Sequence, residues 1–178
     1  AYSFWIYVEG WESGVNPKNI IRHGVTGGPT DCSRNIHLDK EINKLVIKIP
    51  SQQDPIACGN DNEKIEVTNI PLQRWVHVVV TAHNRTLDVY LNGKMVSSRS
   101  MGNIPFSNKK GDDANGLTIC DPSQDKTYDG KFSRFSYHEK ALNPRDVREI
   151  YAKGPEPSGL LGGLLGKYKI KLLFMKGS

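Results

Sequence analysis

The chain has 178 residues, of which 24 are lysine or arginine and 19 are aspartate or glutamate, so its formal net charge at pH 7 is +5. This length suits one domain, and an apolar fraction of 37% with charges spread along the chain argues against wholesale disorder. The longest runs without a charged residue have ten residues. A membrane-spanning helix needs roughly 20 apolar residues, so we expect no membrane span.

Most of the chain shows the alternation of half-buried β-strands. In the first segment, Tyr2, Phe4 and Ile6 fall on one face, and Trp5 and Tyr7 fall on the other. The same period of two predicts strands over residues 2–8, 45–49, 64–68, 75–82, 87–91, 94–98, 117–120 and 131–137.

Residues 75–82 are apolar on both faces, which is typical of a central strand covered on two sides. Four residues separate this segment from the next strand, and Asn92-Gly93 is the strongest two-residue turn signal in the chain. We therefore expect residues 75–82 and 87–92 to pair in the middle of a sheet, with Trp75 largely buried.

One short helix follows the last predicted strand. Asn143 suits the N-cap, Pro144 suits the first helical position, and the Gly154-Pro155 pair ends the pattern. Val147, Ile150 and Tyr151 share one face of this helix. Residues 12–19, 24–35 and 102–115 are rich in turn formers and indicate long loops. The pattern predicts an all-β protein, an antiparallel sandwich or jelly roll with one short C-terminal helix.

Several motifs, in order along the chain, resemble laminin-G-like, concanavalin A-type jelly rolls. They are the Trp-Val-His-Val strand and Tyr-Leu-Asn-Gly turn within residues 74–94, the Phe-Trp strand at 2–8, and the closing strand and helix at 128–135 and 141–151. The resemblance covers residues 2–154. It implies a concanavalin A-like β-sandwich over residues 1–153, followed by an extension over residues 154–178.

A narrower resemblance involves residues 69–77 and 84–93, which are similar to laminin-G-like proteins encoded by large DNA viruses of algae and amoebae. It implies a virion structural, capsid-associated protein whose partners are other virion or capsid proteins. The alternative is a lectin domain at the cell surface or outside the cell that contacts host or virion glycans. A strand that usually precedes residues 2–8 in the family is absent, so either it was trimmed or residues 167–175 replace it.

We expect no enzymatic activity. Relatives that are retaining glycoside hydrolases need two carboxylates about 5–5.5 Å apart. Glu63 and Glu66 do not share a strand face, and Asp88 has no acidic residue at positions 86 or 90. His77, in the middle of a predicted strand, is interpreted as a packed and hydrogen-bonded histidine.

We expect no cofactor, although the resemblance leaves calcium open because many relatives carry a rim site. Candidate ligands are Asp121, Asp125 and Asp129, which lie on one predicted loop. Arg134 stands where the family usually has an acid, and its charge opposes a nearby cation.

Exposed aromatic rings are the usual platforms for sugars. Trp11 and Tyr128 lie in or near predicted loops and are the candidate glycan-binding residues, whereas Trp5 and Trp75 lie on strands and are expected in the core. Asn84-Arg-Thr is a glycosylation sequon at a predicted hairpin tip, with a plain polar turn as the alternative.

Three cysteines, Cys32, Cys58 and Cys120, form no C-x-x-C pair, so zinc is not indicated. Either all three are reduced or one disulfide forms, with Cys32–Cys58 the most plausible pair.

Residues 154–178 hold four lysines and one glutamate, a net charge of +3, which leaves +2 on the other 153 residues. Since those 153 residues show no basic motif with aromatic support, we expect no nucleic-acid partner. We interpret the segment as an assembly tail with one basic and one apolar face, or else as a disordered basic tail. Its candidate residues are Lys167, Tyr168, Lys169, Ile170 and Lys171.

Overall fold

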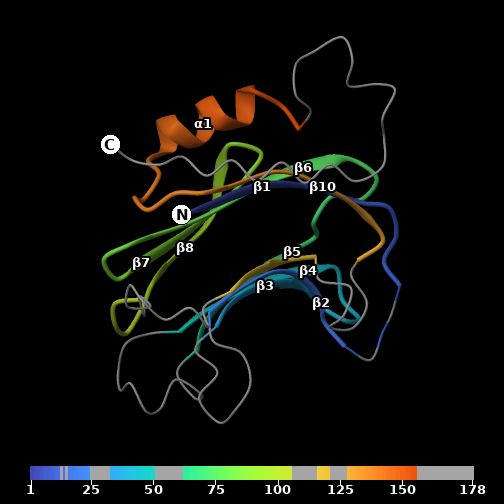
Figure 1. The fold of residues 1–178 in the computed structure, drawn as a ribbon, viewed down its shortest axis with the longest axis horizontal. Helices are drawn as coiled ribbons and strands as arrows, with labels where there is room; N and C mark the ends of the chain where they lie inside the picture. Colours follow the sequence, from blue (N-terminus) through green and yellow to red (C-terminus); the bar gives the residue numbers. More distant parts are fainter. Residues whose placement is uncertain are drawn as a thin grey trace.

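The protein is a sandwich of two five-stranded antiparallel sheets with one helix on the outside (Figure 1). The computed structural model describes residues 1–12, 14, 16–24, 33–50, 62–105, 116–120 and 128–155. The first sheet has the order β10 (Gly130–Tyr137), β1 (Tyr2–Val8), β6 (Trp75–His83), β7 (Thr86–Leu91) and β8 (Lys94–Ser100). The second has the order β5 (Asn62–Thr68), β4 (Lys44–Pro50), β3 (Arg34–Leu38), β2 (Lys18–His23) and β9 (Leu117–Ile119).

The core lies between the two sheets and is built from the alternation visible in the sequence. Tyr2, Phe4 and Ile6 of β1 point inward, and Leu45 and Ile47 of β4 are fully buried in the same cluster. Burying a side chain of this size is worth about 1.5–3 kcal/mol, so the predicted strand faces explain why the sheets associate.

The predicted central hairpin is confirmed, since β6 pairs with β1 on one side and β7 on the other. Asn92 and Gly93 have φ values of 49° and 77°, as the tight turn before β8 requires. Trp75 is only partly buried, which corrects the expectation that it is largely buried. It is the first residue of β6 and meets Tyr7 edge to face, with ring centroids 5.7 Å apart.

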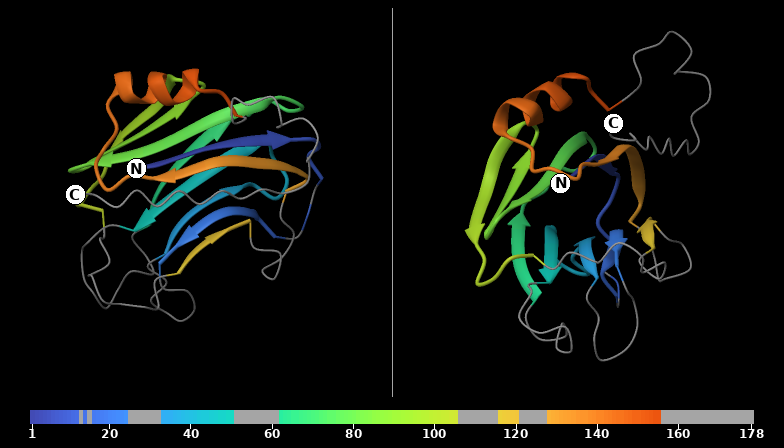
Figure 2. Two further views of the ribbon diagram at one scale, coloured as in Figure 1. Left: turned by 45° about the horizontal axis from the view of Figure 1, so that its top comes forward. Right: turned by 60° about the vertical axis from the view of Figure 1, so that its left-hand side comes forward.

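Helix α1 (Pro144–Ala152) covers the outer face of the first sheet (Figure 2). The Asn143 side chain accepts from the backbone N–H groups of Arg145 and Asp146, as predicted for an N-cap. Val147 is fully buried, and Tyr151 stacks on Trp5 with ring centroids 5.5 Å apart. In the described part of the chain, no helix or strand covers the outer face of the second sheet (Figure 1).

Strands β2 and β3 begin within residues 12–19 and 24–35, which the sequence pattern predicts to be loops. A bulge in β2 brings the consecutive residues Ile20 and Ile21 into the core, which breaks the period of two. Strand β3 has only five residues, three of them polar. Among the described residues, no helix has the length and apolarity needed to cross a membrane.

Candidate functional site

Polar and basic side chains form a straight row, called the basic row below, across the outer face of the second sheet. Ladder pairing joins Arg22 of β2 to Asn35 of β3, Asn35 to Lys48 of β4, and Lys48 to Lys64 of β5. At the other end, Thr118 of β9 pairs with Arg22. Neighbouring strands lie about 4.8 Å apart, so the row from Arg22 to Lys64 spans about 14 Å.

His37 lies beside this row, and the charges of the row influence its pKa. The imidazole Nδ1 lies 2.9 Å from Asn35 Oδ1, and the residue is only 6% exposed. Burial lowers the pKa of His37 to about 4, helped by the positive charge of Lys48 and opposed by Asp39. Lys64 and Lys44 act in the same direction as Lys48. The imidazole is therefore neutral at pH 7, and positive potential dominates around it.

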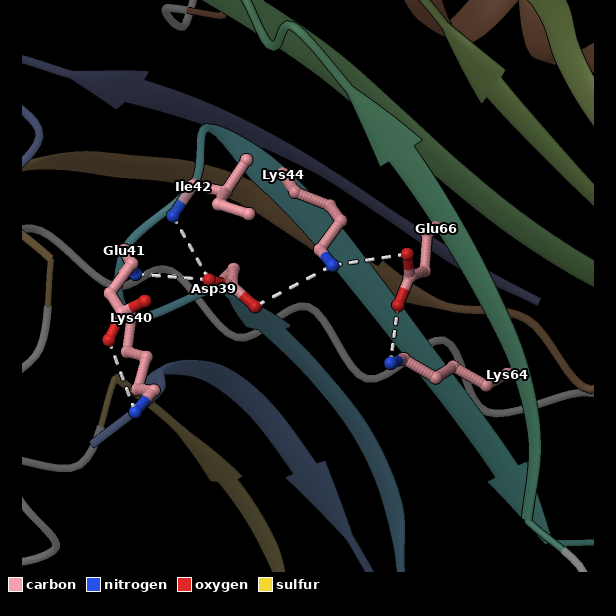
Figure 3. A network of polar contacts seen from close by, with 7 residues as sticks. All are labelled: Asp39, Lys40, Glu41, Ile42, Lys44, Lys64 and Glu66. Carbon is pink, nitrogen blue, oxygen red and sulfur yellow. Dashed lines mark hydrogen bonds and ion pairs between the residues drawn. The ribbon is translucent and has the colours of Figure 1, made fainter. Parts of the chain in front are cut away.

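An ion network adjoins the row and holds the β3–β4 connection (Figure 3). Lys44 Nζ lies 3.1 Å from Glu66 Oε2 and 3.7 Å from Asp39 Oδ2, and Lys64 also pairs with Glu66. Asp39 Oδ1 accepts from the backbone N–H groups of Glu41 and Ile42, both at 3.0 Å. These hydrogen bonds and the nearby Lys44 lower the pKa of Asp39.

Among the residues that the structure describes, the charges on this outer face do not balance. Glu66 is shared by two lysines, whose hydrogen bonds lower its pKa. Lys48 has no ion-pair partner within the described ranges. Exposed ion pairs are worth only about 0–1 kcal/mol each, so the network contributes little to stability. The two carboxylates do not neutralise all the described lysines and arginines of this face, so the basic row keeps a net positive charge.

Two of the acidic residues considered for catalysis, Glu66 and Asp88, lie on different sheets. On its own face, Glu66 has Lys64 and Thr68 as neighbours along the strand and Val46 opposite. Asp88, on the first sheet, accepts a hydrogen bond from Ser98 Oγ at 2.6 Å.

The candidate sugar platforms have different environments. Tyr128 is only 6% exposed and lies in the core, and its hydroxyl donates to the Lys131 carbonyl at 2.7 Å. Tyr128 therefore offers no ring face to a ligand, which corrects its placement as an exposed aromatic. Trp11 is partly buried against the core, with the Lys18 ammonium 5.1 Å from its ring centroid.

The calcium candidates are only partly described. Asp129 is exposed, and its carbonyl accepts from the Glu9 N–H at 2.9 Å. Asp121 and Asp125 lie outside the described residues. Within the described ranges, no three His, Cys, Asp or Glu side chains are grouped as a metal site. A calcium site therefore stays a prediction.

Of the remaining predicted residues, namely the sequon asparagine, the cysteines and the assembly tail, the structure describes only some. Asn84 is exposed in the β6–β7 turn with a φ of 52°, a suitable position for the sequon. Cys120 is a free thiol whose pKa burial raises to about 11. The remaining cysteines, Cys32 and Cys58, and the assembly-tail residues 167–171 lie outside the described residues.

His77 is a packed and hydrogen-bonded histidine, as predicted. It is fully buried, its Nε2 lies 3.0 Å from Ser3 Oγ, and burial lowers its pKa to about 4. Trp5 and Tyr151 enclose the imidazole, with ring centroids 4.9 Å and 5.9 Å away. The serine is buried as well, so this pair is closed to substrate.

Sequence reasoning did not find the basic row, because its members come from different strands and are brought together only by the register. The nearest signal was the placement of a single polar residue between apolar ones, as in Ile47-Lys48-Ile49. Such a pattern indicates which face a residue is on, and it carries no information on its neighbours across the sheet.

Comparison with known proteins agrees with this architecture. The chain resembles the binding domain of botulinum neurotoxin serotype D at 15% identity, with a TM-score of 0.62 over 86% of this chain and 36% of that one. It resembles the neurotoxin DC binding domain, solved with rat synaptotagmin II, at 15% identity and a TM-score of 0.58, over 85% of this chain and 35% of that one. This chain thus spans about a third of those proteins.

A third similar structure is the CBM40 domain of the Ruminococcus gnavus IT-sialidase, solved with α2,3-sialyllactose. It is 10% identical, with a TM-score of 0.60, over 84% of this chain and 80% of that one. No curated protein matches the sequence significantly. The family model of the concanavalin A-like lectin/glucanases superfamily, of the laminin-G type, matches residues 1–148. The chain therefore belongs to the concanavalin A-like lectin/glucanase superfamily.

Proposed function

We propose that this chain is a non-catalytic binding module that holds a linear acidic polysaccharide along the outer face of the second sheet. The observation that carries the proposal is the row of Arg22, Asn35, Lys48 and Lys64, which the ladder places in register. Cationic groups lie at both ends of this row, and an amide that can bond hydroxyl groups lies between them.

The row favours charge over ring stacking as the means of recognition. The described outward positions of β2, β3, β4, β5 and β9 include no Trp, Tyr or Phe, so the usual stacking platform for a neutral sugar is missing from them. Carboxylate and sulfate groups pair with Lys and Arg through charge-assisted hydrogen bonds. The acidic oligosaccharide bound to the similar CBM40 domain is a ligand of this class.

A titration with polymers of matched length tests the proposal. We expect dextran sulfate or polygalacturonate to bind and neutral dextran not to bind. Lys48→Gln combined with Lys64→Gln should weaken binding by about tenfold or more, or ~1.4 kcal/mol. Lys94→Gln, which removes one charge from exposed β8 on the other sheet, is the control and should have little effect.

Three results of this titration would contradict the proposal. They are tight binding of neutral dextran, equal losses in the control and the double variant, and equal affinity for single-stranded DNA of matched charge. The last result would indicate a general polyanion site.

The absence of catalysis is part of this proposal. Purified protein should release no reducing sugar from acidic or neutral glycans between pH 4 and pH 9. Turnover that survives purification and disappears on Glu66→Gln would show that the module is an enzyme.

A second candidate, assembly into a virion, rests on the viral resemblance and on one structural feature. Strand β8 is an edge strand, and its Met95 and Val96 are 48% and 46% exposed. An edge of this kind can receive a further strand. Deleting residues 157–178 should leave the sandwich folded and abolish incorporation into the particle. Normal incorporation would remove this candidate.

A further inference from the structure

A pocket of about 280 Å³ opens between the two sheets at one end of the sandwich. Ala1 lines it together with apolar side chains from Ile49, Val80, Ala82, Leu87, Ile104 and Pro105. Its polar lining comes from Tyr2, Arg34, Asn84, Tyr137 and Glu139. Small-molecule sites begin at about 300 Å³, so the pocket suits a compact ligand.

The polar groups form an ordered cluster. Arg34 Nη1 donates to the Tyr2 hydroxyl at 3.2 Å, and that hydroxyl lies 2.7 Å from His23 Nδ1. A guanidinium only donates, so the Tyr2 hydroxyl accepts from Arg34, while the direction of its hydrogen bond with His23 follows from the imidazole tautomer. The ring of Tyr137 lies 5.3 Å from Tyr2 and 5.5 Å from His23.

The positive charge in this cluster is carried by Arg34. Burial lowers the pKa of His23, and the charge of Arg34 lowers it further, so His23 is neutral at pH 7. Glu139 also lines the pocket, but its side chain is exposed, whereas Arg34 is partly buried. Solvent therefore screens the carboxylate more strongly than the guanidinium.

Part of the pocket rim is apolar, and the exposed lining residues Asn84, Tyr137 and Glu139 make the rest of it polar. Ile104 is 57% exposed although it is a large hydrophobic side chain, and Pro105 lies next to it on the same lining. A cationic group on one side and apolar walls on the other match a ligand with an acidic head and an apolar body.

We propose that this pocket binds a small carboxylic acid with an apolar body, the carboxylate on Arg34 and the body against Ile104 and Leu87. Arginine is well suited to this because its planar donors match a carboxylate. The site is separate from the basic row, since Arg34 points into the sandwich while Asn35, the next residue, points outward.

Phenylacetate and its neutral amide, phenylacetamide, test the site by titration monitored by NMR. We expect the acid to bind at least about tenfold more tightly than the amide. Ile104→Glu places a like charge at the exposed rim and should weaken acid binding, while the matched Ile104→Gln should retain more of it. Since residue 104 is exposed, both variants should fold.

Arg34→Gln should abolish the preference for the acid, and Arg145→Gln, on the exposed face of α1, should leave it unchanged. Equal binding of acid and amide, or equal effects of Ile104→Glu and Ile104→Gln, would overturn the proposal. The Lys48→Gln and Lys64→Gln double variant should bind phenylacetate normally, so failure at this pocket is distinguishable from failure of the polysaccharide site.

Discussion

Gly130 shows how closely two segments of the backbone approach each other at the start of β10. A Cβ atom at this position would lie 1.9 Å from the Tyr7 carbonyl oxygen and 2.7 Å from the Tyr128 ring. A carbonyl in a strand ladder cannot move away without breaking its pairing, so only glycine fits there.

We expect Gly130→Ala to lower the free energy of unfolding by at least about 1 kcal/mol. Gly10→Ala is the control, because a Cβ at position 10 meets nothing within 4 Å. Urea denaturation of both variants checks the expectation. Equal midpoints would contradict this close approach of the two backbones.

Two buried histidines link stability to pH. Burial lowers the pKa of His37 and His77 to about 4 in the folded protein, while an unfolded histidine titrates near ~6.5. Between these values the unfolded chain binds more protons than the folded chain. This contribution to stability is therefore complete above pH ~6.5 and declines as the pH falls towards 4.

Each histidine should contribute a slope of up to about 1.4 kcal/mol per pH unit in this window. His37→Gln should reduce the slope, measured by urea denaturation at pH steps from 7 to 4. His83→Gln, at an exposed hairpin position, should leave it unchanged. An unaltered slope in the first variant would show that His37 is not buried as a neutral imidazole.

At the scale of elements, helix α1 combines a strong local signal with a packing role. The Asn143 cap and the buried Val147 were both visible in the sequence. The helix also packs closely against the β7–β8 turn. A Cβ atom on Gly93 of that turn would lie 3.1 Å from the Tyr151 ring.

Asn143→Ala should destabilise the protein by about 1 kcal/mol, since two backbone N–H groups lose their acceptor. Asn143→Asp is the matched control and should retain most of the stability because it still accepts both bonds. Thermal unfolding separates the two variants. An alanine variant as stable as the aspartate variant would contradict the capping role.

The strands show which parts of the fold can be predicted. The β6–β7 and β7–β8 turns followed from local residue types, such as Asn92-Gly93. Strand β2 was missed because its bulge, at Ile20 and Ile21, depends on how the strand pairs with β3. Tyr128 was misplaced because aromatic residues beside loops are equally suited to close a core.

At the scale of the whole molecule, the two outer faces of the sandwich differ. The first sheet is covered by α1 (Figures 1 and 2). The second presents Arg22, Lys48 and Lys64 in one row. Of the net charge of +5, +3 lies in residues 154–178 and only +2 in residues 1–153. Register brings Arg22, Lys48 and Lys64 together on one face, and no composition argument predicts that.

The most direct test maps where an acidic polysaccharide binds. Backbone amide chemical shifts are recorded while an oligosaccharide of polygalacturonate is added to the full chain. The largest changes are expected at Asn35, Lys48 and Lys64, with α1 unaffected and the same changes lost in the Lys48→Gln and Lys64→Gln double variant. Changes centred on α1, or changes that persist in the double variant, would contradict the assignment of this face as the binding site.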